Sequence, residues 1–394
     1  MNPDYDVIIA GGGMTGASLA CALGGRQIKV ALLEANTPQT AACGYDDRGI
    51  ALSLSSMHIY DSLGLWSQLG EHVTPIERIH VSEKGRFPKV RFSAARQGLA
   101  ALGYVVIARQ LGNVLLQTIE RLDNIEFITP ARSTGVVRNA DHVAVSFDQA
   151  GSEKTITGKL LVVADGADSH TGKLLGITTQ ITDYAERAFV THVMPEKPHL
   201  NTAYERFTPQ GSVALLPSTA GRCVAIYVAA EETAAVLEQL SPPALLEKIQ
   251  QRLGKRLGVL QRPGKVKSYP LACMTADCQV QERVVLLGNA AHTVHPNAAQ
   301  GFNLCLRDTA ALAALISAQS ASASDPGDVQ ALQQYYQTRR ADQRKVMAFT
   351  RGLHSLFYTR NPLKQFARHS IMFAIDAVPM LKHCVIRQAS GLAD

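Results

Sequence analysis

The chain has 394 residues, of which 46% are hydrophobic and 18% are charged. This composition supplies enough apolar surface for a large packed interior, and it excludes a mainly disordered protein. A formal net charge of +6 is modest for this length and gives no sign of a nucleic-acid-binding surface.

The sequence favours a cytoplasmic protein. Asp4 and Asp6 stand where a signal peptide would need basic residues, so we expect no export. No run of about 18 apolar residues predicts a membrane-spanning helix. The seven cysteines contain no C-x-x-C pair, which excludes a dithiol redox centre and a zinc ribbon and favours free thiols.

The first strong pattern is a strand, a turn and a helix at the N-terminus. Residues 7–10 form a short apolar run, a glycine-rich turn follows at residues 11–16, and the small residues 15–23 are typical of a closely packed helix. A second apolar run, residues 29–33, ends on Glu34. This order predicts a β-α-β unit with an acid about 20 residues after the glycines, as dinucleotide binding requires.

The residue types in this unit suit a dinucleotide. Gly11, Gly13 and Gly16 can turn the chain, let a pyrophosphate approach the backbone, and pack the helix on the strand. The phosphate would then lie at the helix N-terminus, and Glu34 could accept hydrogen bonds from both ribose hydroxyls. A glycine-rich turn without a ligand is the alternative, and the combined pattern argues against it. This β-α-β unit would suit NAD and FAD equally.

Further along the chain, we expect a helix over residues 109–122 and a buried strand over residues 159–164 that ends in Asp165. Residues 186–270 alternate between apolar and polar, and residues 213–217 and 223–228 are separated by turn residues. This texture predicts an antiparallel substrate layer that contains a hairpin.

The last third returns to the nucleotide region. Residues 283–287 predict a third buried strand that leads into Gly288. Residues 317–328 predict a surface loop, and residues 330–349 predict a long basic helix.

Two of these segments carry a family resemblance. Residues 164–169 (ADGADS) resemble the Asp-Gly motif of the single-component FAD-dependent aromatic hydroxylases. Residues 288–292 (GNAAH), with His295-Pro296 and residues 300–303 (QGFN), resemble their Gly-Asp motif. Residues 47–53 (DRGIALS) and 204–207 (YERF) resemble the ubiquinone-biosynthesis branch, and within it the 2-polyprenyl-6-methoxyphenol hydroxylases.

The resemblance implies a role for each matching residue. Pro296 would lie by the flavin ring near the substrate, and Pro296 and His295 are the candidate catalytic residues. An ordinary tight turn at Asp165 and purely structural roles for His292 and His295 are the alternatives. The candidate FAD-binding residues are Gly11, Gly13, Gly16, Glu34, Arg48, Arg109, Asp165, Gly288, Asn289, Gln300, Gly301, Phe302 and Asn303.

Three positions depart from the family pattern. Asn289 stands where many members have Asp, so the acceptor for the ribityl chain is uncharged. Ala299 stands where a glycine is usual, which limits backbone freedom. Gly172 stands where an arginine associated with FAD and NAD(P)H contacts is common, and this leaves the electron donor open.

The resemblance also implies an α/β architecture. We expect a Rossmann-type FAD-binding domain of the glutathione-reductase kind over residues 1–75, 100–180 and 278–345. An interleaved antiparallel-sheet substrate domain would cover residues 76–99 and 181–277, and a C-terminal helical segment residues 346–394.

The implied function is hydroxylation of the aromatic ring of a polyprenylated methoxyphenol through a flavin C4a-hydroperoxide. FAD, O₂ and NADH, NADPH or another reductant would take part, and no metal is required. The alternatives are a flavin reductase of prenyl lipids with the same fold and a non-catalytic dinucleotide-binding subunit. Trp66 is the sole tryptophan, which excludes the paired-tryptophan signature of flavin halogenases.

The C-terminal part is basic and amphipathic. Residues 339–387 contain ten Lys or Arg and two acids, and Leu363, Phe366, Ile371 and Ile375 belong to an apolar stripe with helical spacing. Such a stripe, flanked by Lys364, Arg368 and Lys382, would suit peripheral contact with a membrane that holds a prenylated substrate. Packing on the protein's own core or on another subunit is the alternative. Other ubiquinone-biosynthesis proteins are possible partners, and nucleic acid is not.

Overall fold

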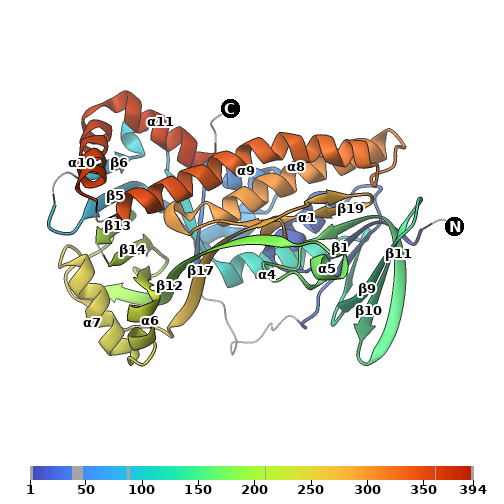
Figure 1. Ribbon diagram of the computed structural model, residues 1–394, viewed down its shortest axis with the longest axis horizontal. Coiled ribbons are helices and arrows are strands. Elements are labelled where there is room, and N and C mark those ends of the chain that lie inside the picture. Colours follow the sequence, from blue (N-terminus) through green and yellow to red (C-terminus); the bar gives the residue numbers. More distant parts are fainter. Residues whose placement is uncertain (1–2, 38–47, 87–88, 209, 360, 392–394) are drawn as a thin grey trace.

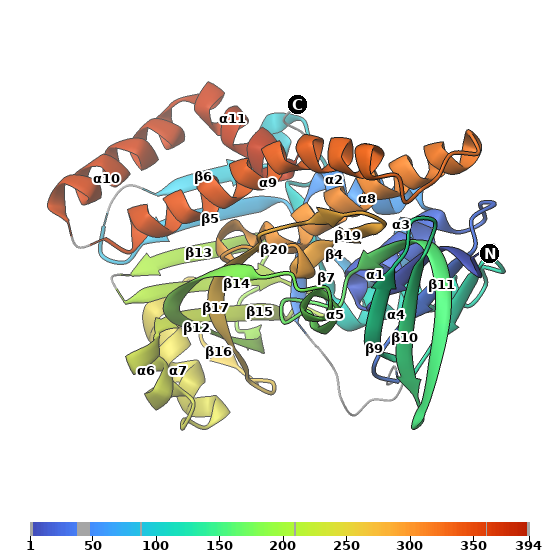
Figure 2. The same cartoon turned by 45° about the vertical axis from the view of Figure 1, so that its right-hand side comes forward.

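A computed structural model describes residues 3–37, 48–86, 89–208, 210–359 and 361–391 (Figure 1). Asp47, which belongs to one of the family-like motifs, and Cys43 lie outside the described residues. The two ends of the elongated molecule hold different sheets, and a pair of long helices runs along both (Figures 1 and 2).

The first sheet has the strand order β18-β19-β11-β1-β2-β8, in which β19, β11, β1, β2 and β8 pair in parallel. Residues 7–10 of β1, all of β2 and residues 160–163 of β11 are continuous apolar runs because both faces of the sheet are covered. The predicted Rossmann-type unit is therefore confirmed. The strands of this sheet are β1 (Tyr5–Ala10), β2 (Val30–Leu33), β8 (Ile125–Ile128), β9 (Arg132–Arg138), β10 (Val143–Gln149), β11 (Ser152–Val163), β18 (Val280–Gln281) and β19 (Val284–Leu286).

Helices α1 (Met14–Leu23) and α4 (Ala108–Ile119) cover one face of this sheet together with α8 (Gly301–Ala321). Small residues let α1 lie close to β1, since a Cβ on Gly16 would be 2.0 Å from the carbonyl oxygen of Gly11. Strands β9 and β10 fold over the opposite face with the short helix α5 (His170–Leu174). The core of this half therefore lies on both sides of β1 and β11.

A small sheet, β3-β7-β4, joins the two halves. Its strands are β3 (Gly49–Leu52), β4 (Val73–Ile76) and β7 (Gly103–Ile107), and near them lie α2 (Leu54–Ser62), α3 (Trp66–Leu69) and the 3-10 turns η1 (Gly70–His72) and η2 (Ala95–Gln97).

The third sheet has the order β20-β17-β12-β15-β14-β13-β5-β6, with β16 beside β12, and all its pairs are antiparallel except β13 with β5. The predicted antiparallel layer and its hairpin, β14 with β15, are confirmed. The boundaries of the predicted domains stay a proposal. The strands are β5 (Arg78–Glu83), β6 (Val90–Ser93), β12 (Thr179–Pro195), β13 (Thr202–Thr208), β14 (Gly211–Pro217), β15 (Cys223–Ala230), β16 (Leu260–Gln261), β17 (Lys267–Ala276) and β20 (His292–Thr293).

Different helices pack on the two faces of this third sheet. Helices α6 (Glu231–Leu237) and α7 (Pro242–Leu253) pack on the face that carries Phe189, Val213 and Tyr227. The other face carries Phe207, which stacks on Phe357 near the end of α9 (Val329–Phe357) with ring centroids 3.8 Å apart. Alternate residues of each strand therefore meet different surroundings.

Helices α8 and α9 correct two expectations. The predicted loop over residues 317–328 is wrong in its first part, because α8 continues to Ala321. Alanine is the strongest helix former, and the Ser317 hydroxyl donates to the carbonyl of Ala313, so this Ser/Ala composition is compatible with a helix. The predicted basic helix is longer than expected and reaches Phe357.

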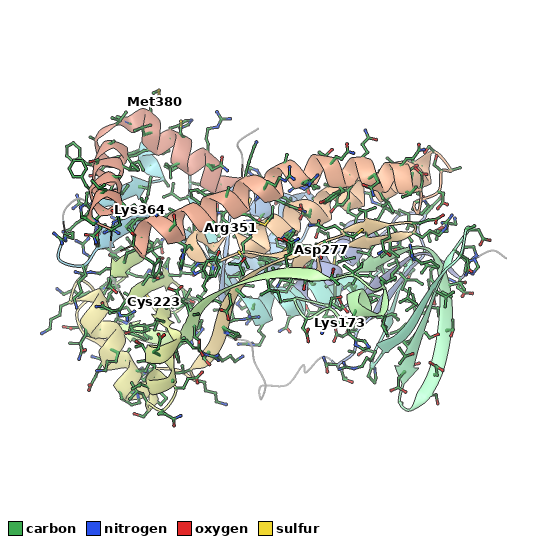
Figure 3. The ribbon with its side chains drawn as sticks, in the orientation of Figure 1. Lys173, Cys223, Asp277, Arg351, Lys364 and Met380 are labelled. Atoms are coloured by element: carbon green, nitrogen blue, oxygen red, sulfur yellow. The ribbon has the colours of Figure 1, made fainter. Side chains whose placement is uncertain are left out.

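The C-terminal segment forms α10 (Pro362–Ala377) and α11 (Pro379–Ser390). Among the described residues, no single helix has the length and apolarity needed to cross a membrane, but these two together meet that test, bent by 100°. Lys364 and Met380 lie at the same end of the molecule on these helices (Figure 3). Exposed apolar side chains here are Leu363, Phe366, Ile371, Phe373, Val378, Met380 and Leu381.

The proposed basic flank of this stripe is partly wrong. Arg368 is 2% exposed, and it donates to the carboxylate of Glu83 on β5 over 2.6 Å and to the carbonyls of Leu356 and Phe357. His369 contacts the other Glu83 oxygen at 2.8 Å. The helical spacing predicts which residues of α10 share a face, but it does not predict which face is buried. Arg368 lies on the buried face.

Replacing Arg368 with alanine would leave Glu83 as a buried carboxylate without its guanidinium. We expect Arg368→Ala to lower the free energy of unfolding by about 3–5 kcal/mol, measured by urea denaturation. Lys364→Ala, on the same helix but exposed, is the control and should change it by less than about 0.5 kcal/mol. Equal effects of the two substitutions would contradict the anchoring role of Arg368.

Candidate active site

Three loops that are far apart in the sequence meet at one edge of the parallel sheet. They follow β1, β11 and β19, whose carboxyl ends point the same way because these strands are parallel. A Cβ on Gly11 would lie 2.5 Å from the carbonyl oxygen of Ala164, and one on Gly288 would lie 2.7 Å from Cγ2 of Thr15. Only glycine fits at these contacts, and both glycines have positive φ, 111° and 65°.

A cavity of about 330 Å³ opens between the first two loops. Gly11, Gly13, Glu34 and Asp165, all candidate cofactor residues from the sequence, line it. Sequence reasoning missed the contribution of the segment after β8, whose carboxyl end lies at the same edge. The cavity's further lining includes Ala131, Arg132, Ser133, Asp168, His170 and Thr171.

The two acids of this cavity already have partners. Glu34 accepts hydrogen bonds from the backbone N–H groups of Gly12 and Asn36 at 2.8 and 2.9 Å. Asp165 accepts from the backbone N–H of Thr171 at 2.8 Å and from the Ser169 hydroxyl, which links its turn to the start of α5. Each carboxylate therefore shapes a loop in addition to facing the cavity.

Gly172, at the position where an arginine is common, is buried in α5. A Cβ there would lie 2.9 Å from the Ser169 hydroxyl oxygen, so the local packing suits glycine. The neighbouring Lys173 pairs instead with Asp168 at the surface.

The two candidate arginines lie next to each other in the fold. Arg48 precedes β3 and Arg109 is in the first turn of α4, and the backbone N–H of Ala108 donates to the Arg48 carbonyl at 2.9 Å. The Arg48 guanidinium also lies 5.1 Å from the ring centre of Tyr269. Their pairing follows from the β3–β7 register, which sequence reasoning did not predict.

The third loop begins with Gly288 and the exposed Asn289 in η3 (Gly288–Ala290) and ends with η4 (Asn297–Ala299) and the start of α8. Asn289 Oδ1 lies 3.7 Å from Sγ of Cys305. Ala299 has a φ of 51°, and the adjacent Ala298 has 63°. Both adopt a left-handed conformation that costs about 1–2 kcal/mol without glycine, which explains why a glycine is usual at position 299.

The side-chain amides at the start of α8 hold the loop together. Asn303 donates to the carbonyls of Ala51 and Ala299 at 2.9 and 2.7 Å and accepts from the Ser53 N–H and the Ser56 hydroxyl. Gln300 donates to the carbonyls of Ala298 and Ala389. The side chains of Gln300 and Asn303 therefore hold the loop, and the backbone of Gly301 and Phe302 lies between them.

His292 has a structural position. It is 1% exposed, and its Nε2 lies 2.7 Å from Oδ2 of Asp308. Asp308 also accepts from Arg339 at 2.6 Å and from Gln343 at 3.1 Å. This buried network joins β20 to α8 and α9, and its geometry fits the structural alternative for His292.

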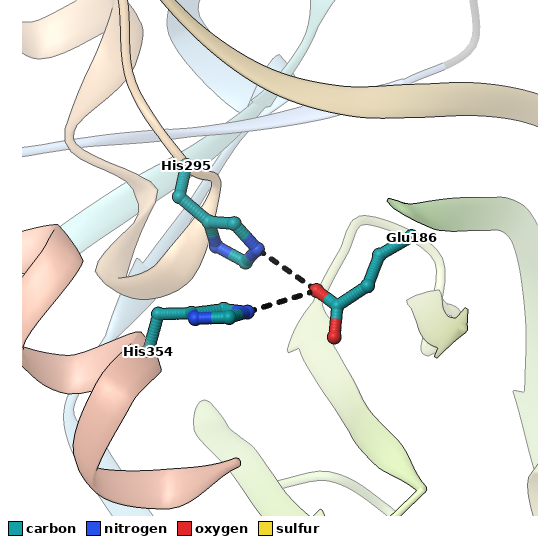
Figure 4. Close-up of side chains that lie close together, drawn as sticks. All are labelled: Glu186, His295 and His354. Atoms are coloured by element: carbon teal, nitrogen blue, oxygen red, sulfur yellow. Dashed lines mark hydrogen bonds and ion pairs between the residues drawn. The ribbon is translucent and has the colours of Figure 1, made fainter. Parts of the chain in front are cut away.

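His295 belongs to a cluster that sequence reasoning did not assemble (Figure 4). Its Nε2 and the Nε2 of His354 each lie 3.3 Å from the same carboxylate oxygen of Glu186. Glu186 comes from β12, His295 from the third loop and His354 from α9. Tyr184 packs against both imidazole rings, with ring centres 4.8 and 4.5 Å away.

The charge state of this cluster follows from its contacts. Burial by itself raises the pKa of Glu186, but hydrogen bonds and charges from His295 and His354 outweigh it and lower the pKa to about 2. An ionised carboxylate can only accept hydrogen bonds, so the Nε2 of His295 that faces Glu186 carries a proton. The Nδ1 of His295 accepts a hydrogen bond from the Asn297 N–H at 3.3 Å. Both ring nitrogens of His295 thus have partners, which fits a positioning role beside Pro296.

The same three side chains could hold a metal ion, because their candidate ligand atoms all lie within 4.8 Å of one another. Two histidines and one carboxylate are a common set for such ions. The reaction expected from the sequence requires no metal. That expectation stays a prediction.

A second acid on the same face of the sheet was also missed as a site residue. Burial raises the pKa of Glu205 to about 7, although a hydrogen bond to Ser212 lowers it. Tyr358 stacks on His354 with ring centres 4.6 Å apart, and burial and the charges of Glu186 and Glu205 raise its pKa. The available sequence signal was an acid within the family-like segment 204–207 (YERF).

Comparisons with known proteins agree with this geometry. A family model described as FAD binding domain matches residues 4–350. The chain is 32% identical over 387 residues to the ubiquinone hydroxylase UbiL of Rhodospirillum rubrum, covering 98% of this chain and 89% of that one. It is 29% identical over 398 residues to the 3-demethoxyubiquinol 3-hydroxylase of Escherichia coli, covering 99% and 100%.

Solved structures share the fold. That of the p-nitrophenol 4-monooxygenase PnpA from Pseudomonas putida superposes with a TM-score of 0.83 at 17% identity, and the match covers 100% of both chains.

Gly13 allows the nucleotide loop to be tested without disturbing the fold. A Cβ there would meet no described protein atom within 4 Å. We expect Gly13→Ala to change the unfolding free energy of the ligand-free protein by about 1 kcal/mol or less, but to lower the flavin content of the purified protein several-fold. Gly112→Ala, in α4 with equally open space, is the control and should retain flavin. Full flavin retention in Gly13→Ala would contradict the placement of the pyrophosphate.

The lowered pKa of Glu186 gives a pH dependence with a defined sign. Its ionised form stabilises the fold above the unfolded pKa of about 4.3, and this contribution is lost as the pH falls toward about 2. Glu186→Gln should therefore cost on the order of 2 kcal/mol at pH 7 and progressively less below pH 4.5, measured by urea denaturation. The exposed Glu232→Gln is the control, and a loss for Glu186→Gln that is independent of pH would contradict the assignment.

Proposed function

This chain belongs to the FAD-binding-domain family that includes the ubiquinone-biosynthesis hydroxylases, and we propose that it hydroxylates the ring of a polyprenylated methoxyphenol on the way to ubiquinone. It is an FAD-dependent aromatic-ring monooxygenase that uses O₂ and a reduced electron donor. The family, the FAD cofactor and the fold class predicted from the sequence are confirmed.

The observation that carries the proposal is the convergence of the three loops at one edge of the parallel sheet. The residues there fit FAD. Gly13 leaves open space at the N-terminus of α1, where backbone N–H groups attract phosphate. Among the described residues, the buried Nδ2 of Asn297, next to Pro296, has no hydrogen-bond partner, so a donor is available for a ligand at that end.

We assign the parts of FAD to residues as follows. The glycine turn and Glu34 hold the ADP portion, Arg48 and Arg109 approach the pyrophosphate, and Asp165 supports its loop. Gly288 and Asn289 hold the ribityl region. The backbone between Gln300 and Asn303 lies beside the ring system, and Pro296 lies between the ring and the substrate. These assignments are proposals that the loop geometry supports.

Bound FAD, once reduced by the donor, supplies the chemistry that inserts one oxygen atom of O₂ into a ring C–H bond, while the other atom leaves as water. The protein must position the phenol and keep bulk water out. We propose that Glu205, which lies on the same sheet face as Glu186 and whose pKa burial raises to about 7, accepts the phenol proton and returns it. His295 positions the Pro296 turn through Glu186. The chemical route of oxygen transfer expected from the resemblance stays a prediction.

A prenylated phenol is a membrane lipid, so we also propose peripheral contact with the bilayer. The support is the set of exposed apolar side chains on α10 and α11, among them Leu363, at 78% exposed, and Phe366, at 73%. Nearby cations such as Lys364 would favour an anionic surface. The inner side of the same helix, which carries Arg368 and Met372, packs on the protein itself.

The proposal predicts the fate of labelled oxygen. The purified protein should carry a flavin spectrum that NADH or NADPH bleaches, and with ¹⁸O₂ it should place one labelled atom in a short-chain prenyl methoxyphenol, detected by mass spectrometry. Hydrogenated product without label would indicate a prenyl reductase. Absence of bound flavin would contradict both a hydroxylase and a reductase.

Deletion of the gene should cause a prenylated phenol to accumulate, and normal ubiquinone synthesis would contradict the substrate assignment.

A further inference from the structure

A second cavity, of about 480 Å³, lies on the face of the third sheet that faces away from the candidate active site. In the β13–β5 register, Tyr204 pairs with His80 and Arg206 pairs with Ser82, and all four line this cavity. Glu205 lies between them in sequence and points to the opposite face. The loop after α7 closes the other side of the cavity.

Cations dominate its lining. Five positive side chains contribute, namely Arg86, Lys89, Arg206, Lys255 and Arg256. The lining contains one acid, Glu83, and its two carboxylate oxygens are already bonded to Arg368 and His369. Within the described part of the chain, none of the five cations is paired with a carboxylate. The cavity thus has an excess of positive charge without a neutralising group.

Buried donors in this cavity also lack acceptors. His80 is 6% exposed, and its Nδ1 lies 2.8 Å from Nη1 of Arg256. A guanidinium can only donate, so His80 Nδ1 accepts and Nε2 carries the proton. Nε2 of His80 and Nε of Arg206 are buried and find no hydrogen-bond partner among the described residues. A buried donor without an acceptor costs about 1–3 kcal/mol, which an acceptor from a ligand would recover.

The electrostatics support the same conclusion. Burial and the charges of Arg256 and other nearby cations lower the pKa of His80 to about 4, so it is neutral at physiological pH. Burial and the charge of Arg256 also lower the pKa of Arg206. These cations repel one another across the cavity, and an anion between them would remove that repulsion.

We propose that this cavity binds a phosphate-bearing anion. Two guanidinium groups and a histidine N–H suit the several oxygens of phosphate, and the number of cations suits a charge larger than that of one carboxylate. The volume exceeds that of a phosphate ion and leaves room for a substituent against Tyr204 and Leu257. A free phosphate compound and a phospholipid headgroup share this chemistry. Glu83 joins the cavity to α10, whose outer side carries exposed apolar residues.

The test uses the full-length protein with flavin bound and two probes. Pyrophosphate binding is measured by calorimetry, and vesicle binding is measured by co-sedimentation with phosphatidylcholine vesicles that contain or lack phosphatidylglycerol. Arg256→Gln is the main variant, because Arg256 is exposed and its loss should not disturb the core. We expect it to weaken binding of at least one probe by about tenfold or more. Lys248→Gln, an exposed cation on α7 that does not line the cavity, should change binding by less than about twofold.

The outcomes separate the sources and can overturn the proposal. Binding of pyrophosphate that depends on Arg256 identifies a free phosphate compound as the ligand class. Binding only to anionic vesicles, again dependent on Arg256, identifies a lipid headgroup. Absence of binding to both probes, or equal effects of Arg256→Gln and Lys248→Gln, overturns it. Lys89→Gln is a second cavity variant if Arg256→Gln proves unstable, and flavin content and melting temperature verify that each variant is folded.

Discussion

The parallel register of β1, β11 and β19 is the constraint on which the rest of the site depends. Ala10 is paired with Val163, and Val163 with Leu286. The three strands therefore end at the same edge of the sheet, in register with one another. Because side chains alternate along a strand, a slip of one residue would turn each loop to the other face. The close contacts of Gly11 and Gly288 are possible only in this register. A groove for one extended nucleotide is thus a product of backbone hydrogen bonding.

The two faces of the third sheet are chemically different. Along β13, Glu205 and Phe207 face α9 and the Glu186 cluster, whereas Tyr204 and Arg206 face the loop after α7. A single strand therefore contributes an acid of raised pKa to one side and a cation to the other. The sheet itself separates the two environments, and the apolar core under α7 lies on the side of the cation.

The predictable part of this protein is the part whose signals are local. The glycine turn, Glu34 and Asp165 lie at ends of short apolar strands, and that order of residues specifies both the fold and the edge at which they meet. Glu186 and His354 have no such signal, because they meet His295 only through the sheet register and the path of α9. The burial of Arg368 was missed because helical spacing defines a face without saying what covers it. The helix that replaces residues 317–321 of the expected loop shows that a Ser/Ala composition does not by itself distinguish loop from helix.

Helix α9 contacts two buried polar groups, one around Asp308 and one around Glu186. Arg339, ten residues after the first residue of α9, binds Asp308, and His354, 15 residues later, contacts Glu186. That interval is about 22 Å of helix, so a tilt of about 5° around Asp308 would displace His354 by about 2 Å. Such a displacement would break its 3.3 Å contact with Glu186. The orientation of one long helix therefore contributes, together with the contact from His295, to the lowered pKa of Glu186.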